Sequence, residues 1–391
     1  MDRQRIVDAF VGRLGFLTAF RKRPNRAAVP IRIYVAKGHG SSSITRLITA
    51  GLRAGGLRAC GKTSTTSPRL LFPDGREYPV YRPSNANLRE QRRVTRVAEQ
   101  ERADVLVLEG IATKDDGQLS AGLQAELQAL NATHVVLANG LPQQTDARDK
   151  VVSRLAAVVA DRGKLFAAVT GVDETEFLAV IDDEQIADVR WVEMERFSYI
   201  EYREHVAIAL RVCEELGVDR ETALSGMWRA NPDPGVATVF QASSPSASTD
   251  CGVTFVNGFA VSDPARLRRS WEIAAGRFRN RPRLAIVNCR ADRPECWRRL
   301  ADSLAKWTPA DHYLIIGTAA TLFAQRLQSL GIDRDRISCT RVESADRIGI
   351  LARRLGGEAA LVLGIGSMSG ATWGLVNYFR KREARTLQNA A

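Results

Sequence analysis

The fold class is decided by the stretch Ile31-Arg-Ile-Tyr-Val-Ala-Lys-Gly-His-Gly-Ser-Ser-Ser-Ile-Thr-Arg-Leu-Ile-Thr-Ala-Gly-Leu52. Residues 31–35 are mostly apolar and predict a strand, residues 37–43 are small and polar, and residues 44–52 return to helical spacing. A strand, a glycine turn and a helix in this order begin a βαβ unit. The N–H groups of such a turn converge on phosphate oxygens. We therefore expect a nucleotide-phosphate loop made of Gly38, Gly40, Ser41, Ser42 and Ser43.

This loop lacks one residue that phosphate loops normally carry. A lysine usually follows the last glycine and neutralises the phosphates, and the next Ser or Thr binds magnesium. Here Ser41 takes the place of the lysine, while Ser42 keeps the metal-binding hydroxyl. Lys37 lies at the other end of the loop, and two interpretations stay open: a substitute for the missing cation, or a solvated loop lysine.

Strand and helix patterns alternate along the rest of the chain. Further strands are predicted at residues 105–108, 134–138, 164–169, 284–288, 313–316 and 360–363. Helices are predicted at residues 88–102, 151–161, 206–216, 266–278, 298–306, 322–330 and 345–355. Such alternation is typical of an α/β fold with mostly parallel sheets covered by helices.

The chain has 391 residues, which is more than one domain usually contains. The prolines of Asn231-Pro-Asp-Pro-Gly235 disfavour both helix and strand, so we expect domains at residues 31–235 and 236–391. The Ser-rich residues 241–252 predict a hairpin tip between strands at 236–240 and 253–256.

Residues 1–30 form a separate basic segment. Ile6, Phe10, Leu14 and Leu17 recur at helical spacing among arginines, which predicts a basic amphipathic helix. Such a helix can lie on an anionic membrane, dock on a partner, or pack on its own domain. Because no signal-peptide pattern precedes it, we expect a cytoplasmic protein, at the inner face of the membrane if the helix binds lipid.

The formal net charge of +12 attracts anions without choosing among them. Nucleic-acid binding would rest on this charge alone, since no recognition motif accompanies it, and we expect none. The six cysteines are scattered and contain no C-x-x-C pair, so no zinc site is expected.

Several motifs together resemble the ligase subunit of poly-γ-glutamate synthase, a relative of the Mur peptide ligases and folylpolyglutamate synthases. The resemblance covers residues 31–382. Besides the loop, it rests on Lys62-Thr63 with Thr66 and Arg69, Asn231-Pro-Asp-Pro-Gly235, Phe255-Val-Asn-Gly-Phe-Ala260 with Asp263-Pro264, and Asn288-Cys-Arg-Ala-Asp-Arg293.

The resemblance implies a Mur-ligase-like domain with a phosphate loop, followed by a smaller Rossmann-like domain. It implies an ATP- and Mg²⁺-dependent amide ligase, in which ATP phosphorylates a glutamate carboxylate and an amine then attacks. The implied partners are glutamate or a poly-γ-glutamate chain, a catalytic ligase homologue, a membrane subunit, or a second copy of the chain.

The resemblance also assigns roles to single residues. Glu109 ends a predicted strand and matches the magnesium-binding glutamate; an exposed strand-end acid is the alternative. Asp146 matches a catalytic acid. The implied nucleotide contacts outside the loop are Thr63, Thr66, Asn139 and His205.

The chain departs from the family at several of these positions. Gln143 and Gln144 stand where the family has an Asp-His pair. His205 falls where the family has an Asn near the nucleotide, and an ordinary histidine at a helix start is the alternative. Together with the missing lysine, these changes remove charge from several sides of one phosphate. We therefore expect an impaired or inactive ligase, a pseudoenzyme that works as a partner subunit of a capsule or polymer synthesis complex. An active ligase forming γ-glutamyl amide bonds is the alternative.

In the C-terminal half, the matched motifs place polar side chains after predicted strands, where parallel sheets carry function. We expect Asn257 and Asp263 to face the cleft between the domains. Arg290 or Arg293 would bind a substrate carboxylate through two hydrogen bonds, with Asp292 beside them. An ion pair between Asp292 and an arginine that only orders the loop is the alternative.

Overall fold

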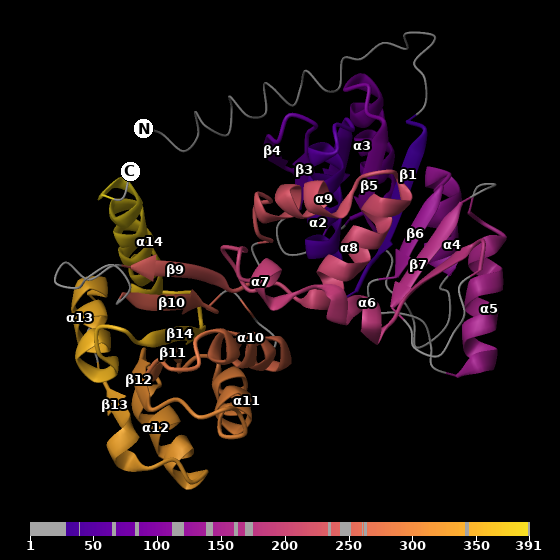
Figure 1. The fold of residues 1–391 in the computed structure, drawn as a ribbon. Helices are drawn as coiled ribbons and strands as arrows, with labels where there is room; N and C mark the ends of the chain where they lie inside the picture. Colours follow the sequence, from indigo (N-terminus) through magenta and orange to yellow (C-terminus); the bar gives the residue numbers. More distant parts are fainter. Residues whose placement is uncertain are drawn as a thin grey trace.

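The computed structural model describes residues 29–38, 40–64, 68–82, 86–111, 121–137, 144–159, 163–168, 175–233, 236–242, 252–259, 261, 264–340 and 344–389. They form two sheets, each covered by helices (Figure 1). Residues 1–28, which include most of the segment expected to form the N-terminal helix, lie outside the described residues. The α/β class predicted from the sequence is confirmed.

The first sheet has eight strands in the order β4-β3-β2-β5-β1-β6-β7-β8. Only the edge pairs β2–β3 and β3–β4 are antiparallel. The strands are β1 (Ile31–Ala36), β2 (Ala59–Lys62), β3 (Arg69–Leu71), β4 (Glu77–Pro79), β5 (Val105–Glu109), β6 (His134–Leu137), β7 (Lys164–Ala168) and β8 (Leu178–Ile181). Since β1 pairs in parallel with both β5 and β6, the C-terminal ends of these three strands meet at one edge of the sheet.

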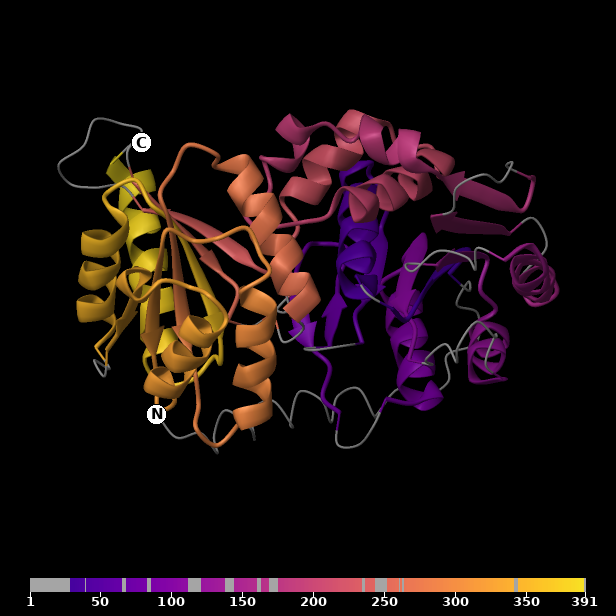
Figure 2. The same cartoon turned by 90° about the horizontal axis from the view of Figure 1, so that it is seen from below.

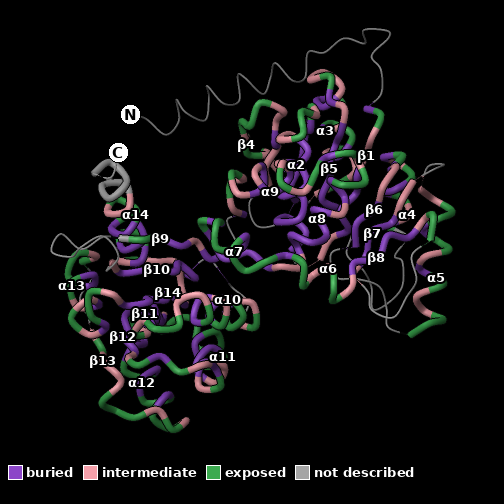
Figure 3. Tube along the Cα trace, in the orientation of Figure 1, coloured by how far each residue is buried: buried purple, intermediate pink, exposed green. Residues whose placement is uncertain are grey.

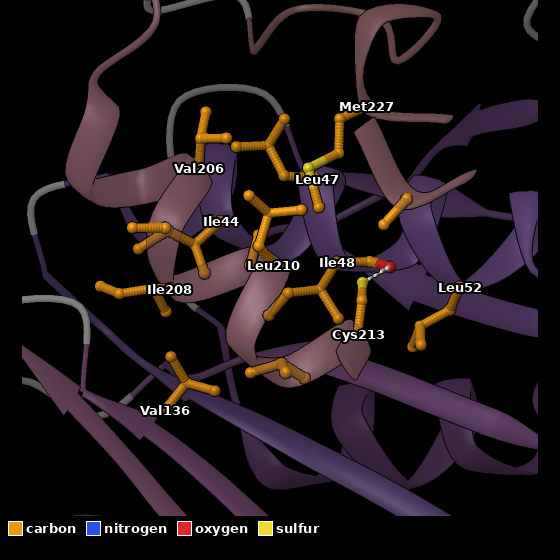
Figure 4. Close-up of a cluster of buried hydrophobic side chains, with 14 of the residues drawn as sticks. Ile44, Leu47, Ile48, Leu52, Val136, Val206, Ile208, Leu210, Cys213 and Met227 are labelled. Atoms are coloured by element: carbon orange, nitrogen blue, oxygen red, sulfur yellow. Dashed lines mark hydrogen bonds between the residues drawn. The ribbon is translucent and has the colours of Figure 1, made fainter. Parts of the chain in front are cut away.

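The helices of this part are α2 (Ser41–Ala54), α3 (Leu88–Gln100), α4 (Ala121–Leu130), α5 (Thr145–Ala156), α6 (Asp183–Asp188), α7 (Trp191–Met194), α8 (Arg203–Glu215) and α9 (Arg220–Trp228). Helix α2 lies against the sheet and against α8 and α9, as Figure 4 shows for Ile44, Leu47 and Leu210. Gly226 permits this approach, because a Cβ there would lie 2.4 Å from the Ala50 carbonyl oxygen. The phosphate-loop helix is thus held on both sides.

The second sheet has six strands in the order β13-β12-β11-β14-β10-β9. Figure 2 shows this sheet, in orange and yellow, between helices on its two sides. Its strands are β9 (Thr238–Ala242), β10 (Val253–Asn257), β11 (Arg283–Asn288), β12 (His312–Ile316), β13 (Ile337–Cys339) and β14 (Leu361–Gly366). Its helices are α10 (Pro264–Arg277), α11 (Pro294–Leu304), α12 (Ala320–Ser329), α13 (Ala345–Gly356) and α14 (Ala371–Asn389). The antiparallel pairing of β9 with β10 confirms the predicted hairpin.

Buried strands run through the centre of both sheets (Figure 3). The predicted strands are all present, but α5 begins at Thr145 and ends at Ala156, whereas the apolar pattern predicted residues 151–161. The strands of the first sheet end at Ile181, and those of the second begin at Thr238. The division at residue 235 stays a prediction. The two parts touch where the Tyr202 hydroxyl donates to the Arg266 carbonyl oxygen of α10 at 3.2 Å.

Candidate phosphate-loop site

The described residues of the loop between β1 and α2 lead directly into the N-terminus of a helix. Gly40 adopts φ +80° directly before α2, a conformation that glycine takes without strain. The Ser41 N–H donates to the Gly38 carbonyl oxygen at 3.3 Å and closes the turn. Ser42 and Ser43 follow in the first turn of α2 and are buried. The N-terminus of α2 therefore stands at the carboxyl edge of the sheet, as the sequence predicted.

Glu109, at the end of β5, joins this loop from the neighbouring strand. The Ser41 hydroxyl donates to its Oε1 and the Ser42 hydroxyl to its Oε2, both at 2.7 Å. The N–H of Ser64 also donates to Oε2. The side chain is fully buried, so the alternative of an exposed strand-end acid is wrong. The residue in the place of the lysine thus directs its hydroxyl to a carboxylate and adds no charge.

A buried cation lies close by, at the end of β2. Lys62 is fully buried, and its Nζ donates to Ser64 Oγ at 2.7 Å and to Glu90 Oε1 at 2.7 Å. Arg82 binds the same Glu90 oxygen at 2.7 Å. Burial lowers the pKa of Lys62, and Glu90 opposes this shift only in part. For Glu90, burial raises the pKa, but the hydrogen bonds from Arg82 and Lys62 bring it below its ordinary value.

A second buried carboxylate fixes the backbone that follows Glu109. Glu126 on α4 accepts the Tyr34 hydroxyl at 2.7 Å, the Gln91 amide at 2.8 Å and the Ile111 N–H at 3.2 Å. Burial, followed by the charge of Glu126, raises the pKa of Tyr34 far above its usual range. Gly110 leaves room for this phenol, since a Cβ there would lie 2.1 Å from its oxygen. Glu109 therefore stands on a rigid support.

His205, in the first turn of α8, reaches the loop from the opposite side. Its Nδ1 lies 2.7 Å from Glu201 Oε1, and both side chains are buried. A Cβ on Gly40 would lie 2.1 Å from its Nε2, so the ring touches the loop backbone. The contact of His205 with a nucleotide stays a prediction, and no sequence pattern indicated its Glu201 partner.

The structure describes three other residues that were predicted for this site. Lys37 is half-buried at the start of the loop, and Asp146 is exposed in the first turn of α5. Thr63 is buried, and its hydroxyl accepts the N–H of Arg69 at 2.9 Å, which closes the β2–β3 hairpin. Thr66 and Asn139 lie outside the described residues.

In the second sheet, the loop after β11 contains an internal ion pair. Arg290 donates to both oxygens of Asp292, at 2.9 and 2.6 Å. The hydrogen bonds of Asp292 raise the pKa of Arg290, and those of Arg290 lower the pKa of Asp292. The ordering ion pair given above as the alternative is therefore present. Arg293 is exposed, and with Arg290 it lines a cavity of about 390 Å³.

Asn257 takes part in the β9–β10 pair, where its amide donates to the Thr238 hydroxyl at 3.3 Å and its side-chain oxygen accepts the Phe259 N–H at 3.3 Å. It is buried, so its contacts are those of a residue that shapes the strand end. Asp263 lies outside the described residues.

Among the described residues, no three or more His, Cys, Asp or Glu side chains lie together in a group that could hold a metal ion. The donor set at the loop is of another kind, with one carboxylate and one hydroxyl. Mg²⁺ is commonly held in this way, because the phosphates and water complete its shell. Ser42 and Glu109 fit that role. Over the same part of the chain, no helix is long and apolar enough to cross a membrane.

The arrangement of a phosphate loop on a parallel sheet, followed by a smaller α/β sheet, is that of the Mur ligases and folylpolyglutamate synthases. A folylpolyglutamate synthase from Thermotoga maritima superimposes with a TM-score of 0.54 at 10% identity, covering 96% of this chain and 97% of that chain. MurF from Acinetobacter baumannii gives a TM-score of 0.57 at 11% identity, covering 91% and 78%. At these identities, the similarity establishes the fold.

Sequence relatives narrow this class to a family. Residues 245–382 match the poly-gamma-glutamate synthase CapB C-terminal domain. The chain is 28% identical to the PGA synthase CapB of Bacillus subtilis (strain 168) over 393 residues, 96% of each protein. It is 30% identical to the capsule biosynthesis protein CapB of Bacillus anthracis over 314 residues, 76% of this chain and 65% of that protein. The chain is thus similar along almost its whole length to a poly-gamma-glutamate synthase CapB, and it is a ligase-family protein.

Proposed function

We propose that this chain is an impaired or inactive member of the ligase family, which binds nucleotide at the phosphate loop and serves as a partner subunit of a poly-γ-glutamate or capsule synthesis complex. The observation that carries the proposal is the hydrogen bond from Ser41 to Glu109. A hydroxyl engaged with a carboxylate cannot neutralise a transferring phosphoryl group. The buried Lys62 does not restore this charge, because Glu90 already binds it.

Retained nucleotide binding is supported by the loop geometry and by the Ser42–Glu109 pair. The two side chains offer oxygen ligands to Mg²⁺, which when bound would spread the negative charge of the phosphates. The loop N–H groups would orient the phosphates at the N-terminus of α2. This chain's own contribution is therefore binding and orientation, while stabilisation of the transferring group is weak.

Phosphate release from ATP by the purified protein, with Mg²⁺ and glutamate present, tests the impairment. We expect a rate close to that of Glu109→Gln, and a higher rate in Ser41→Lys. A wild-type rate that falls at least 100-fold on Glu109→Gln would overturn the proposal.

The partner role calls for a measurement in cells. If the chain acts as a subunit, cells that lack it make less polymer. Expression of the Glu109→Gln variant then restores the polymer yield as well as expression of the wild type does. The second candidate is an active ligase that forms γ-glutamyl amide bonds, which the preserved Ser42–Glu109 pair favours. In that case, Glu109→Gln leaves the yield at the level of the deletion.

A further inference from the structure

The loop is contacted by a buried histidine whose second ring nitrogen is held by a carboxylate. His205 and Glu201 are 6% and 3% exposed, and both lie at or just before the start of α8. The bond from Nδ1 to Glu201 Oε1 fixes the ring, so Nε2 is the nitrogen that meets the backbone at Gly40. A proton on Nε2 would make the ring a cation directed at the loop.

Glu201 needs such a cation. Its Oε1 accepts the Tyr202 N–H at 3.0 Å in addition to the His205 ring, while its Oε2 is buried and has no hydrogen-bond partner among the described residues. A buried carboxylate is costly unless a positive charge compensates it. An Nδ1–H of His205 would provide that partner, and a second proton on Nε2 would then face an anion at the loop.

Tyr202 links the His205 ring to the second part of the molecule. The Tyr202 ring meets the His205 ring edge-on, with centroids 5.1 Å apart. The Tyr202 hydroxyl in turn contacts the Ser270 hydroxyl of α10 at 3.2 Å. These contacts restrict the imidazole to one orientation before any ligand binds, which reduces the entropy lost on binding.

We propose that the Glu201–His205 pair binds a phosphate group of the nucleotide through Nε2 and so supplies part of the positive charge that Ser41 cannot. The inference rests on the proposed nucleotide site and deepens it. His205 is the binding residue, and Glu201 is a positioning residue that compensates its charge. A histidine placed to one side of the loop strengthens binding without taking the place of the lysine at the transferring group, which is consistent with impaired turnover.

The test separates contacts with phosphate from contacts with the base. Calorimetry measures the binding of Mg-ATP, Mg-tripolyphosphate and adenosine to wild type and to His205→Gln, which keeps an amide donor but no charge. Loss of a hydrogen bond to a charged group corresponds to an affinity about 10- to 100-fold weaker. We expect this loss for ATP and tripolyphosphate, and an unchanged affinity for adenosine. His312→Gln is the matched control, since that histidine binds Ser338 in the second sheet.

A second variant examines the carboxylate. Glu201→Gln should weaken tripolyphosphate binding in the same direction, and the double variant should be no weaker than His205→Gln alone, because the two residues act as one unit. Thermal unfolding confirms that each variant is folded; if His205→Gln fails to fold, His205→Asn replaces it.

The possible outcomes are distinct. If wild type binds ATP and tripolyphosphate, and His205→Gln and Glu201→Gln bind them within twofold of wild type, the proposed role of the Glu201–His205 pair is overturned. The nucleotide site then stands. A loss confined to adenosine overturns the phosphate contact in favour of a base contact. Wild type that binds neither ATP nor tripolyphosphate overturns the nucleotide site and the pair together.

Discussion

The Ser42 hydroxyl donates to Glu109 Oε2 at 2.7 Å, although the two residues are 67 positions apart in the chain. The parallel pairing of β1 with β5 creates this contact, since it brings the helix that follows one strand to the last residue of the other. Ser41 binds the second oxygen of the same carboxylate. Both serine hydroxyls are thus hydrogen-bonded to one carboxylate, including the hydroxyl of Ser41, the residue in the place of the lysine.

Replacing Glu109 by glutamine should remove the metal-dependent part of nucleotide binding. The amide carries no charge to attract Mg²⁺ and offers a single oxygen ligand. We expect ATP to bind the variant equally with Mg²⁺ and with EDTA, whereas wild type should bind about 10-fold more tightly with Mg²⁺. Calorimetry under both conditions measures this ratio. Glu214→Gln, at an exposed position of α8, is the control. A metal dependence that survives in Glu109→Gln would contradict the assignment.

Gly40→Ala should destabilise the protein for two separable reasons. The methyl group would meet His205 Nε2 at 2.1 Å, and the backbone has a φ of +80° that alanine adopts with strain. We expect a loss of about 3 kcal/mol in the free energy of unfolding. In a His205→Ala background the collision disappears, so the same change should cost only the backbone strain of about 1 kcal/mol. Urea denaturation of the four proteins gives both values. Equal costs in the two backgrounds would show that the ring does not touch the loop.

Local patterns were sufficient to predict the strand, the loop and the helix at residues 31–52, because the hydrophobic period and the position of the glycines can be recognised from residues close together in the sequence. Glu109 was also predictable, since a carboxylate at a strand end faces the loop in a parallel sheet. Lys62 and Glu201 acquire their importance only through burial and through partners from other elements. The short edge strands β3 and β4 escaped prediction for a related reason: each has three residues, too few for a pattern.

Cysteine labelling should follow burial. Burial raises the pKa of Cys60 to about 12 and the pKa of Cys213 and Cys289 far above the usual range of a thiol. These side chains hold almost no thiolate at pH 8, whereas Cys296 is exposed. N-ethylmaleimide should therefore modify Cys296 in the native protein and leave the three buried thiols intact. Peptide mass spectrometry identifies the labelled sites, and urea-unfolded protein is the control. Rapid native labelling of Cys60 would contradict the burial of β2.

Glu90→Gln should destabilise the protein at neutral pH, because it leaves the buried Lys62 without its carboxylate. Removing one partner of a buried pair costs about 3 kcal/mol. The folded-state pKa of Glu90 is below its ordinary value, so its contribution is complete above that value and is lost as pH falls through the folded-state pKa. The difference in the free energy of unfolding between wild type and variant should therefore be constant from pH 7 to about pH 5. It should disappear below about pH 4.

Lys62 makes stability rise with pH as well, but at alkaline pH. Its pKa is lowered in the folded protein, so the unfolded chain binds more protons there and stability rises with pH. Glu90→Gln should regain stability as the pH rises towards the ordinary pKa of lysine, about 10.4, because Lys62 loses its proton below that value. Adding Lys62→Met to Glu90→Gln should recover much of the loss at pH 7, since no charge is then left buried without a partner. Urea denaturation across this pH range measures all three proteins. A double variant as unstable as Glu90→Gln would mean that the loss comes from Arg82, whose guanidinium also binds Glu90, and not from the buried amine.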